Sequence, residues 1–408
     1  MLDIRYIREH PDEVKDSIKR RGLKIDLDKL FGLDKERIEL QQKSEDLRAK
    51  LKLDGKPTAQ ELEKMQKIKA AYEVASKNYQ RAVEDYQQLL AQVPNLIASN
   101  TPDGDEKNNR QDKTSGEKPK FDFEPLDHVT LSQKLGLFDF EAGARVAGSK
   151  FYYGLDKLVR LSWAVNSLAM DMLRAAGFTM VSVPHMVTEQ IAEGTGFSPR
   201  GDEDQIYKIE GENLHLIATA EIPLTGMFAG ETIDLSAPKL LAALSPCYRK
   251  EAGAYGKFSK GLYRVHQFDK LEMYIFCGPS QSAEMLAKIK QLEEEICQQL
   301  EIPYRVVRIA AGDLSAPAYE KYDIEYWSPA DNSYRELTSC SDCTDYQARR
   351  LNIRYRDEDG KLAYAHTLNG TAVTSSRTTI ALLENHQTKA GEIKIPQALQ
   401  KYYGSNNL

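Results

Sequence analysis

Cysteine is scarce in this sequence. Its 408 residues include five, namely Cys247, Cys277, Cys297, Cys340 and Cys343. Five scattered cysteines are too few for a disulfide framework, and an odd number suits a reducing compartment. Cys340 and Cys343 form one CxxC with neither a second pair nor a histidine at ligand spacing, so we do not expect a zinc site. We expect a cytoplasmic protein with buried or incidental thiols.

Long apolar runs are also missing. No segment is long enough to span a bilayer, and the start, MLDIRYIREHPDEV, has neither an apolar core nor the Arg-rich, acid-poor composition of a transit peptide. The formal net charge is −6, so any RNA contact has to use a local basic patch. We expect neither export nor a membrane partner, and no DNA partner.

Glycine and proline are rare in residues 1–100, where helix-forming residues dominate. The second half of this segment repeats every seven residues in two interlocked rows, Met65, Tyr72, Tyr79 and Tyr86 with Ile68, Ala75, Ala82 and Leu89. A weaker pair of rows precedes them, Leu33, Leu40 and Leu47 with Leu30, Arg37, Ser44 and Leu51. Such rows are typical of the a and d positions of a coiled coil. The pattern predicts two helical arms, at about 27–52 and 59–93.

The two predicted arms must fold back antiparallel. Gly55 and Pro57 can turn the chain between them, and Thr58 with Glu61 forms a capping-box pattern at the start of the second arm. Basic residues gather near this turn, at Arg48, Lys50, Lys52 and Lys56. They suit contact with phosphate, although a solvated helix face explains them equally well. A dimerisation coiled coil or a passive spacer is the alternative interpretation of the hairpin.

The chain is long enough for two domains. Residues 101–120, TPDGDEKNNRQDKTSGEKPK, are polar and rich in turn formers, so we expect a mobile linker there. It would join a helical domain at 1–100 to a larger domain at 121–408. The larger part mixes helices with glycine-punctuated β-rich segments without a repeated βα unit, which predicts an antiparallel α+β domain.

Glycine-rich phosphate loops are absent as well. The sequence has no GxxxxGK[ST] and no GxGxxG after a strand, so side chains would have to hold a nucleotide. The stretch LSPCYRKEAGAYGKFSKGLYRVHQFDKLEMYIF predicts two strands joined by a flexible loop at about 252–260. Arg249 and Glu251 would share a face of the first strand, and Arg264, Phe268 and Glu272 a face of the second.

A guanidinium, an aromatic ring and carboxylates in one space suit an adenine nucleotide and an amino acid, because they can bind phosphate, stack on a base and pair with ammonium. A half-exposed sheet with charged cross-strand pairs is the alternative. His266 falls in the same strand pattern, and we interpret it as a core or hydrogen-bonded histidine rather than a general base.

Several segments together resemble one family. YRKEAG followed by GLYRVHQFDKLE resembles the second signature motif of class II aminoacyl-tRNA synthetases in its seryl form. Three further segments are also similar to the seryl form of this family, namely TAEIPLT, ELTSCSDCTDYQARRLNIRYR and LNGTAVTSSRTTIALLENHQ. The resemblance covers nearly the whole chain. It implies an antiparallel class II catalytic domain, preceded by an all-α domain whose long coiled-coil hairpin binds tRNA.

The resemblance implies an ATP site made by Arg249, Glu251, Arg264, Val265, Phe268, Glu336, Ser339 and Arg377. Arg249 would bind the α-phosphate and the substrate carboxylate, and Arg377 the γ-phosphate, so these two are the expected catalytic residues. Glu251 would lie near the adenine amino group, Phe268 would stack on adenine, and Arg264 would assist the pyrophosphate end of ATP.

The resemblance also implies that Glu336 and Ser339 coordinate Mg²⁺. Their spacing of three puts them on opposite faces of an ideal strand, so we predict a bend or bulge there. The implied serine-binding residues are Thr219, Glu221, Arg249, Glu272, Asn369 and Thr371. Asn369 and Thr371 should share one strand face, and their polar groups would be left unsatisfied by alanine.

The expected activity is ligation of serine to serine tRNA with ATP and Mg²⁺, by a homodimer whose hairpin meets the long variable arm of the tRNA. Whether selenocysteine tRNA is also charged stays open. Three alternatives remain: transfer of serine to a carrier protein, a homologue without catalysis, and a class II synthetase for another amino acid. One departure from the family is TAVTSSR, which lacks the glycine often found before the arginine of the third motif.

Overall fold

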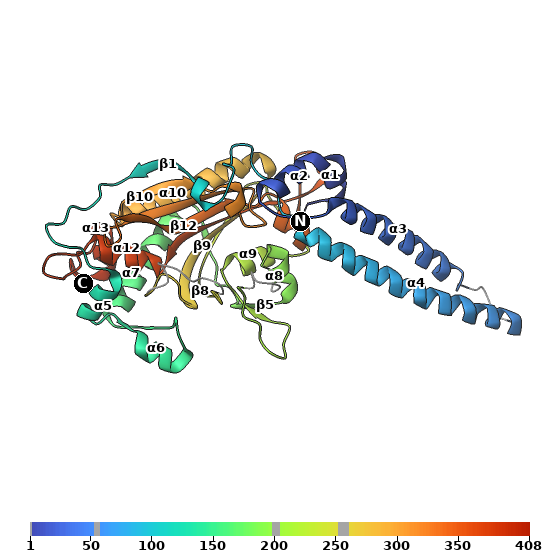
Figure 1. Ribbon diagram of the computed structural model, residues 1–408, viewed down its shortest axis with the longest axis horizontal. Helices are drawn as coiled ribbons and strands as arrows, with labels where there is room; N and C mark the ends of the chain where they lie inside the picture. Colours follow the sequence, from blue (N-terminus) through green and yellow to red (C-terminus); the bar gives the residue numbers. More distant parts are fainter. Residues whose placement is uncertain (1, 53–57, 198–204, 252–260) are drawn as a thin grey trace. The chain divides into compact units, whose positions relative to one another are not determined.

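The structure is a computed structural model that describes residues 2–52, 58–197, 205–251 and 261–408 (Figure 1). The chain forms two compact units, residues 1–96 and 97–408. The predicted turn at Gly55 and Pro57, the basic residue Lys56 and the glycine-rich loop at 252–260 lie outside the described residues, as does the side chain of Glu61.

The first unit is entirely helical in its described part. Its helices are α1 (Ile4–Glu9), α2 (Pro11–Arg20), α3 (Leu27–Ala49) and α4 (Ala59–Gln92). The side chain of Asp26 caps α3 by accepting from the backbone N–H of Lys29 at 2.9 Å. Where the two long helices meet the short ones, Leu30, Tyr86 and Leu90 are buried in one apolar cluster with residues of α1 and α2. The predicted pair of helical arms is confirmed.

The two heptad rows of each arm form the contact between α3 and α4. All their members from Leu30 to Leu51 and from Met65 to Leu89 are buried or half-buried. Arg37, one of the two polar interruptions, lies with its Cζ 5.0 Å from the ring centroid of Tyr86 and pairs with the buried Asp34 at 2.6 Å. The charge on Arg37 is therefore compensated within the coiled-coil interface.

The second unit is built on an eight-stranded sheet with the order β1-β10-β11-β12-β15-β9-β8-β4. Its strands are β1 (Arg110–Ser115), β4 (Thr179–Met180), β8 (Lys239–Tyr248), β9 (Gln267–Cys277), β10 (Tyr304–Arg308), β11 (Glu320–Ser328), β12 (Ser333–Asp342) and β15 (His366–Thr374). Neighbouring strands pair antiparallel, except for β4 and β8, which pair parallel. The predicted antiparallel α+β fold is confirmed.

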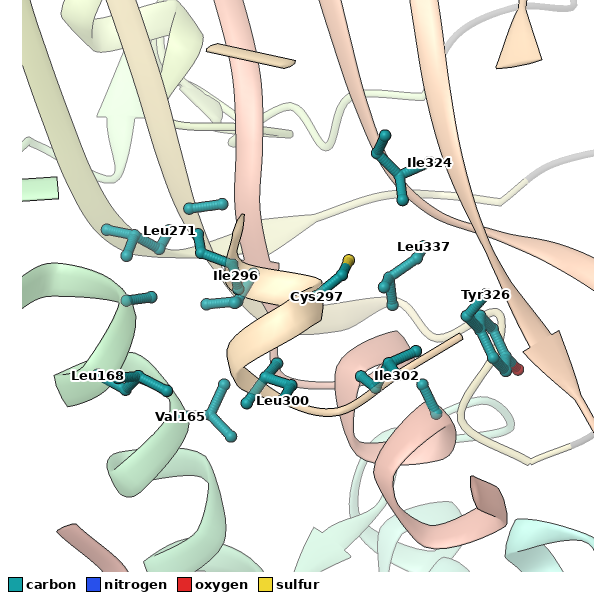
Figure 2. Close-up of a cluster of buried hydrophobic side chains, with 14 of the residues drawn as sticks. Val165, Leu168, Leu271, Ile296, Cys297, Leu300, Ile302, Ile324, Tyr326 and Leu337 are labelled. Atoms are coloured by element: carbon teal, nitrogen blue, oxygen red, sulfur yellow. The ribbon is translucent and has the colours of Figure 1, made fainter. Parts of the chain in front are cut away.

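One face of this sheet packs on helices α7 (Lys157–Ala175), α10 (Ser282–Gln299), α12 (Arg377–Asn385) and α13 (Gln397–Tyr403). Figure 2 shows part of this core, where Leu168 of α7, Ile296 of α10 and Leu271 of β9 converge. The odd-numbered residues of β9 from Leu271 to Cys277 belong to this core. Because side chains alternate along a strand, Phe268, Lys270 and Glu272 point to the opposite face.

Short elements surround the sheet. The helices are α5 (His128–Leu135), α6 (Phe140–Ala147), α8 (Glu189–Thr195), α9 (Glu221–Gly226) and α11 (Tyr346–Leu351), with 3₁₀ turns at Glu106–Asn108, Pro279–Gln281 and Ala311–Asp313. The strands are β2 (Phe138–Asp139), β3 (Tyr153–Gly154), β5 (Met186–Val187), β6 (His215–Leu216), β7 (Thr232–Ile233), β13 (Arg354–Arg356) and β14 (Leu362–Tyr364). Residues of α9 and α11 pack with Tyr274 and Phe276 in a second apolar cluster, so these two helices lie on the face of β9 opposite the main core.

The prediction of a linker at 101–120 is wrong for residues 110–115. Arg110–Ser115 forms the edge strand β1, which pairs with β10, and the first unit ends at Leu96 instead of residue 100. Five of the six residues of β1 are exposed. An edge strand with polar residues on both faces lacks the apolar alternation that identifies a strand in sequence, so it resembles a linker. No helix of the described part of the chain is long and apolar enough to cross a membrane.

Candidate active site

A polar pocket opens at the sheet, where β9, β12 and β15 meet the start of α12. Eight of the predicted site residues line it: Arg249, Glu251, Val265, Phe268, Glu336, Ser339, Thr371 and Arg377. These residues come from three segments of the sequence, the first and last of which are more than a hundred positions apart. The fold therefore brings together most of the groups that we predicted to bind ATP.

Two of the predicted strand assignments at this pocket are wrong. The ladder between β8 and β9 ends at Tyr248 and Gln267, so Arg249, Glu251 and Arg264 lie beyond the strands. Glu251 has a φ of +45°, which is outside the strand region. Arg264 reaches Glu251 through an ion pair of 3.1 Å, with its own side chain 42% exposed. The contact between them therefore does not depend on strand alternation.

Arg249 is fixed close to Phe268. Its Nε donates to the carbonyl oxygen of Ala218 at 3.3 Å, and its Cζ lies 5.3 Å from the Phe268 ring centroid. The Nδ1 of His266 lies 2.9 Å from the carbonyl oxygen of Arg249 and donates to it. His266 is thus a hydrogen-bonded histidine that holds the backbone beside Arg249, in agreement with the sequence interpretation. The guanidinium and the ring face one pocket as a neighbouring pair.

The predicted irregularity between Glu336 and Ser339 is confirmed. In the ladder of β11 and β12, Glu325 pairs with Glu336 whereas the preceding Ile324 pairs with Thr338, so β12 contains one extra residue. This bulge lets Glu336 and Ser339 line the same pocket despite their spacing of three.

Arg377 is the first residue of α12, with Ser376 as N-cap. Its Nη1 lies 2.7 Å from Oε1 of Glu336. Burial alone would raise the pKa of Glu336, but the charges of Arg377 and Lys321 outweigh it and lower this pKa to about 2. Glu336 is therefore an ionised carboxylate throughout the physiological range.

Five of the predicted serine-binding residues lie together where the start of α9 meets β9 and β15, and we call them the deeper cluster. Thr371 pairs across strands with Glu272, which is 1% exposed, and Asn369 precedes Thr371 on the same strand face, as predicted. The Nδ2 of Asn369 donates to Oε1 of Glu221 at 3.0 Å. The Oγ1 of Thr219 accepts from the backbone N–H of Glu221 at 3.2 Å. Four of these five side chains are almost completely buried, those of Thr219, Glu221, Glu272 and Thr371.

Both carboxyl groups of this cluster have raised pKa values. Burial and the proximity of Glu272 raise the pKa of Glu221 to about 7, and burial raises that of Glu272. Lys270, which sequence reasoning missed, pairs with Glu272 and also lines the pocket. Its position two residues after Phe268 on β9 was a signal that could have identified it. An ammonium group would find two partly compensated carboxyls here.

A second missed residue is Tyr263. It lines the pocket, donates from its hydroxyl to the carbonyl oxygen of Glu336 at 3.3 Å, and lies with its ring centroid 4.9 Å from the Cζ of Arg377. It supports both groups of the Arg377–Glu336 pair. The sequence gives no periodic signal for Tyr263, because it lies outside the regular strand.

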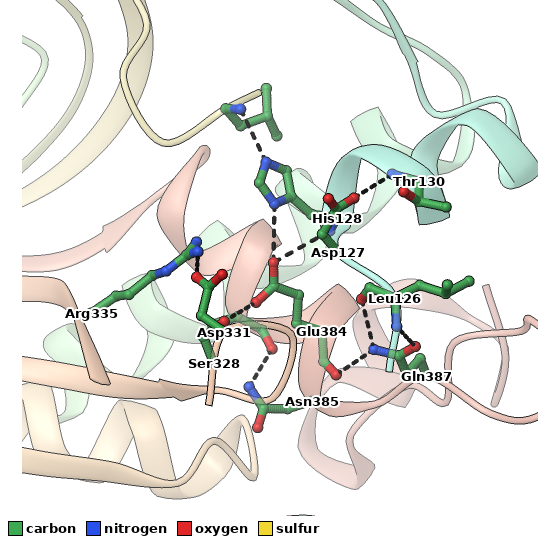
Figure 3. Close-up of polar contacts among 12 residues, drawn as sticks. Leu126, Asp127, His128, Thr130, Ser328, Asp331, Arg335, Glu384, Asn385 and Gln387 are labelled. Carbon is green, nitrogen blue, oxygen red and sulfur yellow. Dashed lines mark hydrogen bonds and ion pairs between the residues drawn. The ribbon is translucent and has the colours of Figure 1, made fainter. Parts of the chain in front are cut away.

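A buried carboxylate anchors the far end of α12 (Figure 3). Oε1 of Glu384 accepts from the backbone N–H of His128 at 3.3 Å and lies 3.0 Å from Nδ1 of its ring, while Oε2 accepts from the Ser328 hydroxyl at 2.6 Å. The Nε2 of His128 accepts from the backbone N–H of Leu262 at 3.3 Å. Glu384 thus links α12, which begins with Arg377, to α5, to the end of β11 and to the segment before β9.

We expect Glu384→Ala to lower the stability of the second unit by about 3 kcal/mol or more, because it leaves three buried donors without an acceptor. The thermal unfolding midpoint measures this effect. Glu284→Ala, which removes an exposed carboxylate of α10, is the control and should change stability by less than about 0.5 kcal/mol. Equal midpoints for the two variants would contradict an anchoring role.

Comparison with known proteins agrees with this architecture. The family model of the seryl-tRNA synthetase N-terminal domain matches residues 1–97, and that of the tRNA synthetase class II core domain (G, H, P, S and T) matches residues 206–386. The serine–tRNA ligase of Dictyoglomus turgidum is 45% identical over 421 residues, covering 100% of this chain and 99% of that protein. That of Borreliella afzelii is 43% identical, covering 99% of this chain and 98% of that protein.

Solved structures give the same result. The seryl-tRNA synthetase of Pyrococcus horikoshii complexed with ATP has a TM-score of 0.89 at 39% identity and covers 100% of this chain and 99% of its own. A prolyl-tRNA synthetase from Giardia lamblia has a TM-score of 0.58 at 14% identity, covers 66% of this chain and 54% of its own, and shares the fold alone. From the matches along its full length, the chain belongs to the seryl-tRNA synthetase family.

Proposed function

We propose that this chain activates serine with ATP to form seryl-adenylate and transfers the seryl group to the 3′ end of serine tRNA. The observation that carries this proposal is the pocket itself. Two guanidinium groups, Arg249 and Arg377, line one pocket together with the ring of Phe268 and the carboxylates of Glu251 and Glu336. Thr371, which also lines it, pairs across strands with the buried Glu272. Triphosphate, adenine and an amino acid each find a chemical partner in this space.

In the first step, a carboxylate oxygen of serine attacks the α-phosphorus of ATP in line, and the bond from that phosphorus to the pyrophosphate oxygen breaks. No protein nucleophile or base is needed. Arg249 binds the substrate carboxylate and the α-phosphate, and Arg377 and Arg264 bind the pyrophosphate end. The enzyme accelerates this step through alignment and charge neutralisation.

Adenine recognition is assigned to three residues that line the pocket. The ring of Phe268 offers its face for stacking, Val265 lines the pocket beside it, and the carboxylate of Glu251 accepts from the adenine amino group. The ion pair between Glu251 and Arg264 keeps that carboxylate in place.

The pocket also fits Mg²⁺. Glu336 supplies an ionised carboxylate and Ser339 a hydroxyl from the same bulge, and hard oxygen ligands of this kind, completed by phosphates and water, suit this cation. When bound there, Mg²⁺ would neutralise phosphate charge. Arg377 stays next to Glu336 through their ion pair, so the γ-phosphate ligand and the metal ligand are positioned together.

Serine recognition uses the deeper cluster. Thr219, Glu221 and Glu272 bind the ammonium and hydroxyl groups, and Asn369 and Thr371 flank the hydroxyl pocket. Alanine would leave these buried polar groups unpaired, which at comparable sites gives a discrimination of roughly 10⁴ or more.

The hairpin of α3 and α4 is the tRNA-binding element in this proposal. Arg48, Lys50 and Lys52 lie at the end of α3 and are all exposed, so they can contact phosphate near the tip. We further propose that the chain works in the cytoplasm as a homodimer that reads the long variable arm of serine tRNA largely by shape.

Amino-acid-dependent pyrophosphate exchange tests this function. Serine should support exchange, alanine should not, and threonine should do so much less than serine. The product formed with serine should then be transferred to serine tRNA. Threonine-dependent exchange that exceeds the serine reaction would indicate a synthetase for another amino acid, and exchange without transfer to tRNA would favour a carrier-protein acceptor.

A further inference from the structure

Gln347, in the first turn of α11, is fully buried beside the proposed serine site. Its Nε2 donates to Oε1 of Glu221 at 2.7 Å and to the carbonyl oxygen of Thr195 at 3.0 Å. Its Oε1 accepts from the hydroxyl of Tyr274 at 2.8 Å and from that of Thr367 at 2.7 Å. A side-chain amide has two donor and two acceptor positions, so all four are used.

This arrangement permits one orientation of the amide. If the amide turned over, its oxygen would face the carboxylate of Glu221 and the carbonyl of Thr195, which are both acceptors. The N–H end is therefore held toward Glu221. The partners come from four elements, α8, α9, β9 and β15, and Gln347 is fully buried among them.

Glu221 receives a second donor on the same oxygen. Nδ2 of Asn369 lies 3.0 Å from Oε1, so two amide groups converge on one side of the carboxylate. We propose that Gln347 is a positioning residue for the amino-acid substrate, which keeps the Glu221 carboxylate ionised and aimed at the substrate ammonium group. This inference rests on the proposed function, since it explains how the serine site stays charged.

The surrounding charges make such help necessary. Burial is the main cause of the raised pKa of Glu221, about 7, and the charge of Glu272 on β9 adds to it. The hydrogen bond from Gln347, Lys270 on β9 and Arg249 after β8 lower it. The Tyr274 hydroxyl and the Cys343 thiol also lie nearby. Without the Gln347 donor, the pKa of Glu221 would rise further, so more of it would be neutral at pH 7.

The test is Gln347→Met in the full chain, which keeps the length of the side chain and removes its donor. Serine KM at neutral pH should rise by about tenfold to a hundredfold, because a hydrogen bond to a charged group is lost. ATP KM should stay within about twofold of the wild-type value. The ratio of variant to wild-type serine KM should fall from about pH 6.5 to 8.5, as Glu221 regains its charge. Using this ratio cancels the ionisation of serine itself.

Two further variants sharpen the test. Gln298→Met removes an exposed glutamine that donates to the Tyr304 hydroxyl at 3.0 Å outside the pocket, and it should leave both KM values unchanged. Gln347→Glu keeps the shape but places a second carboxyl against Glu221, so serine KM should rise at least as much as in Gln347→Met.

A parallel rise of the serine and ATP KM values, or a serine KM ratio that is the same at every pH, would assign Gln347 a merely structural role and overturn the proposal. Failure of both Gln347 variants to fold, seen as loss of the wild-type unfolding transition, would overturn it too. A wild-type protein without serine-dependent exchange would instead refute the proposed function, so the two failures are distinguishable.

Discussion

Arg249→Ala is expected to abolish serine-dependent pyrophosphate exchange. Arg249 is the group that we propose to contact both substrates, the carboxylate of serine and the α-phosphate of ATP, where negative charges approach each other. Loss of a single donor at such a site typically lowers the rate by about a hundredfold to a thousandfold, and alanine removes a bidentate cation. We expect kcat/KM to fall by at least about a thousandfold.

Two matched variants separate charge from geometry. Arg249→Lys keeps the positive charge but loses the planar fork, so it should recover part of the lost activity and remain well below wild type. Arg356→Ala removes an exposed arginine of β13 that donates to the carbonyl oxygen of Gly360, and it should leave exchange unaffected. Exchange by Arg249→Ala at a rate near that of Arg356→Ala would mean that the pocket around Phe268 is not the activation site.

Local periodicity made the helical hairpin predictable. Heptad rows such as Tyr72, Tyr79 and Tyr86 specify a helix and its contact face from neighbouring residues alone, and α3 and α4 begin at the residues where the arms were expected. Only the C-terminal ends of the arms shifted, by one to three residues, with α3 ending at Ala49 instead of 52. Helix ends depend on capping contacts that a heptad pattern does not encode.

The limits of strand alternation explain the errors at the pocket. Alternation predicted that Arg264 shares a face with Phe268, but it holds only while the ladder continues, and the ladder begins at Gln267. The same rule succeeded for Glu336 and Ser339, where an impossible spacing on a regular strand required the bulge that β12 contains. Strand alternation is therefore informative in two ways. It predicts which residues share a face of a regular strand, and it predicts a bulge where two residues expected at one site have an odd spacing.

Buried polar residues and the edge strand β1 could not be predicted from sequence periodicity, because they depend on tertiary contacts. Gln347 and Glu384 are fully buried polar residues, and their roles follow from partners that lie between 20 and 256 positions away. The edge strand β1 was missed because neither of its faces is apolar. Such elements become visible only when the partner strand or the buried donor is known.

Truncation of the hairpin is expected to impair transfer of serine to tRNA while leaving the activation of serine with ATP intact. Leu27, Leu30, Tyr86 and Leu90 belong to the core of the first unit, so a deletion has to spare them. Arg37 stacks on Tyr86, and one heptad further along Ser44 is level with Tyr79. Deletion of residues 45–78, with Ser44 and Tyr79 joined by a short Gly/Ser loop, therefore shortens the hairpin without opening its base.

In this truncated protein, serine-dependent exchange should remain within about twofold of wild type, because the activation residues all lie in the second unit. The kcat/KM for serine tRNA in aminoacylation should fall by at least about tenfold, since phosphate contacts along the hairpin are lost. The salt dependence of aminoacylation gives an independent measure. It should be shallower in the truncated protein, because fewer counterions are released when the tRNA binds.

The basic tip can be tested within the intact hairpin. Replacing Arg48, Lys50 and Lys52 by Gln keeps all three side chains polar and exposed, and should weaken tRNA charging and flatten its salt dependence while exchange is unchanged. Full charging activity in the truncated protein would refute the tRNA-binding role of the hairpin and leave a dimerisation or spacer role. If the truncated protein lost charging while the triple variant kept it, the hairpin would bind tRNA through its length rather than its tip, since shape is then read without these charges.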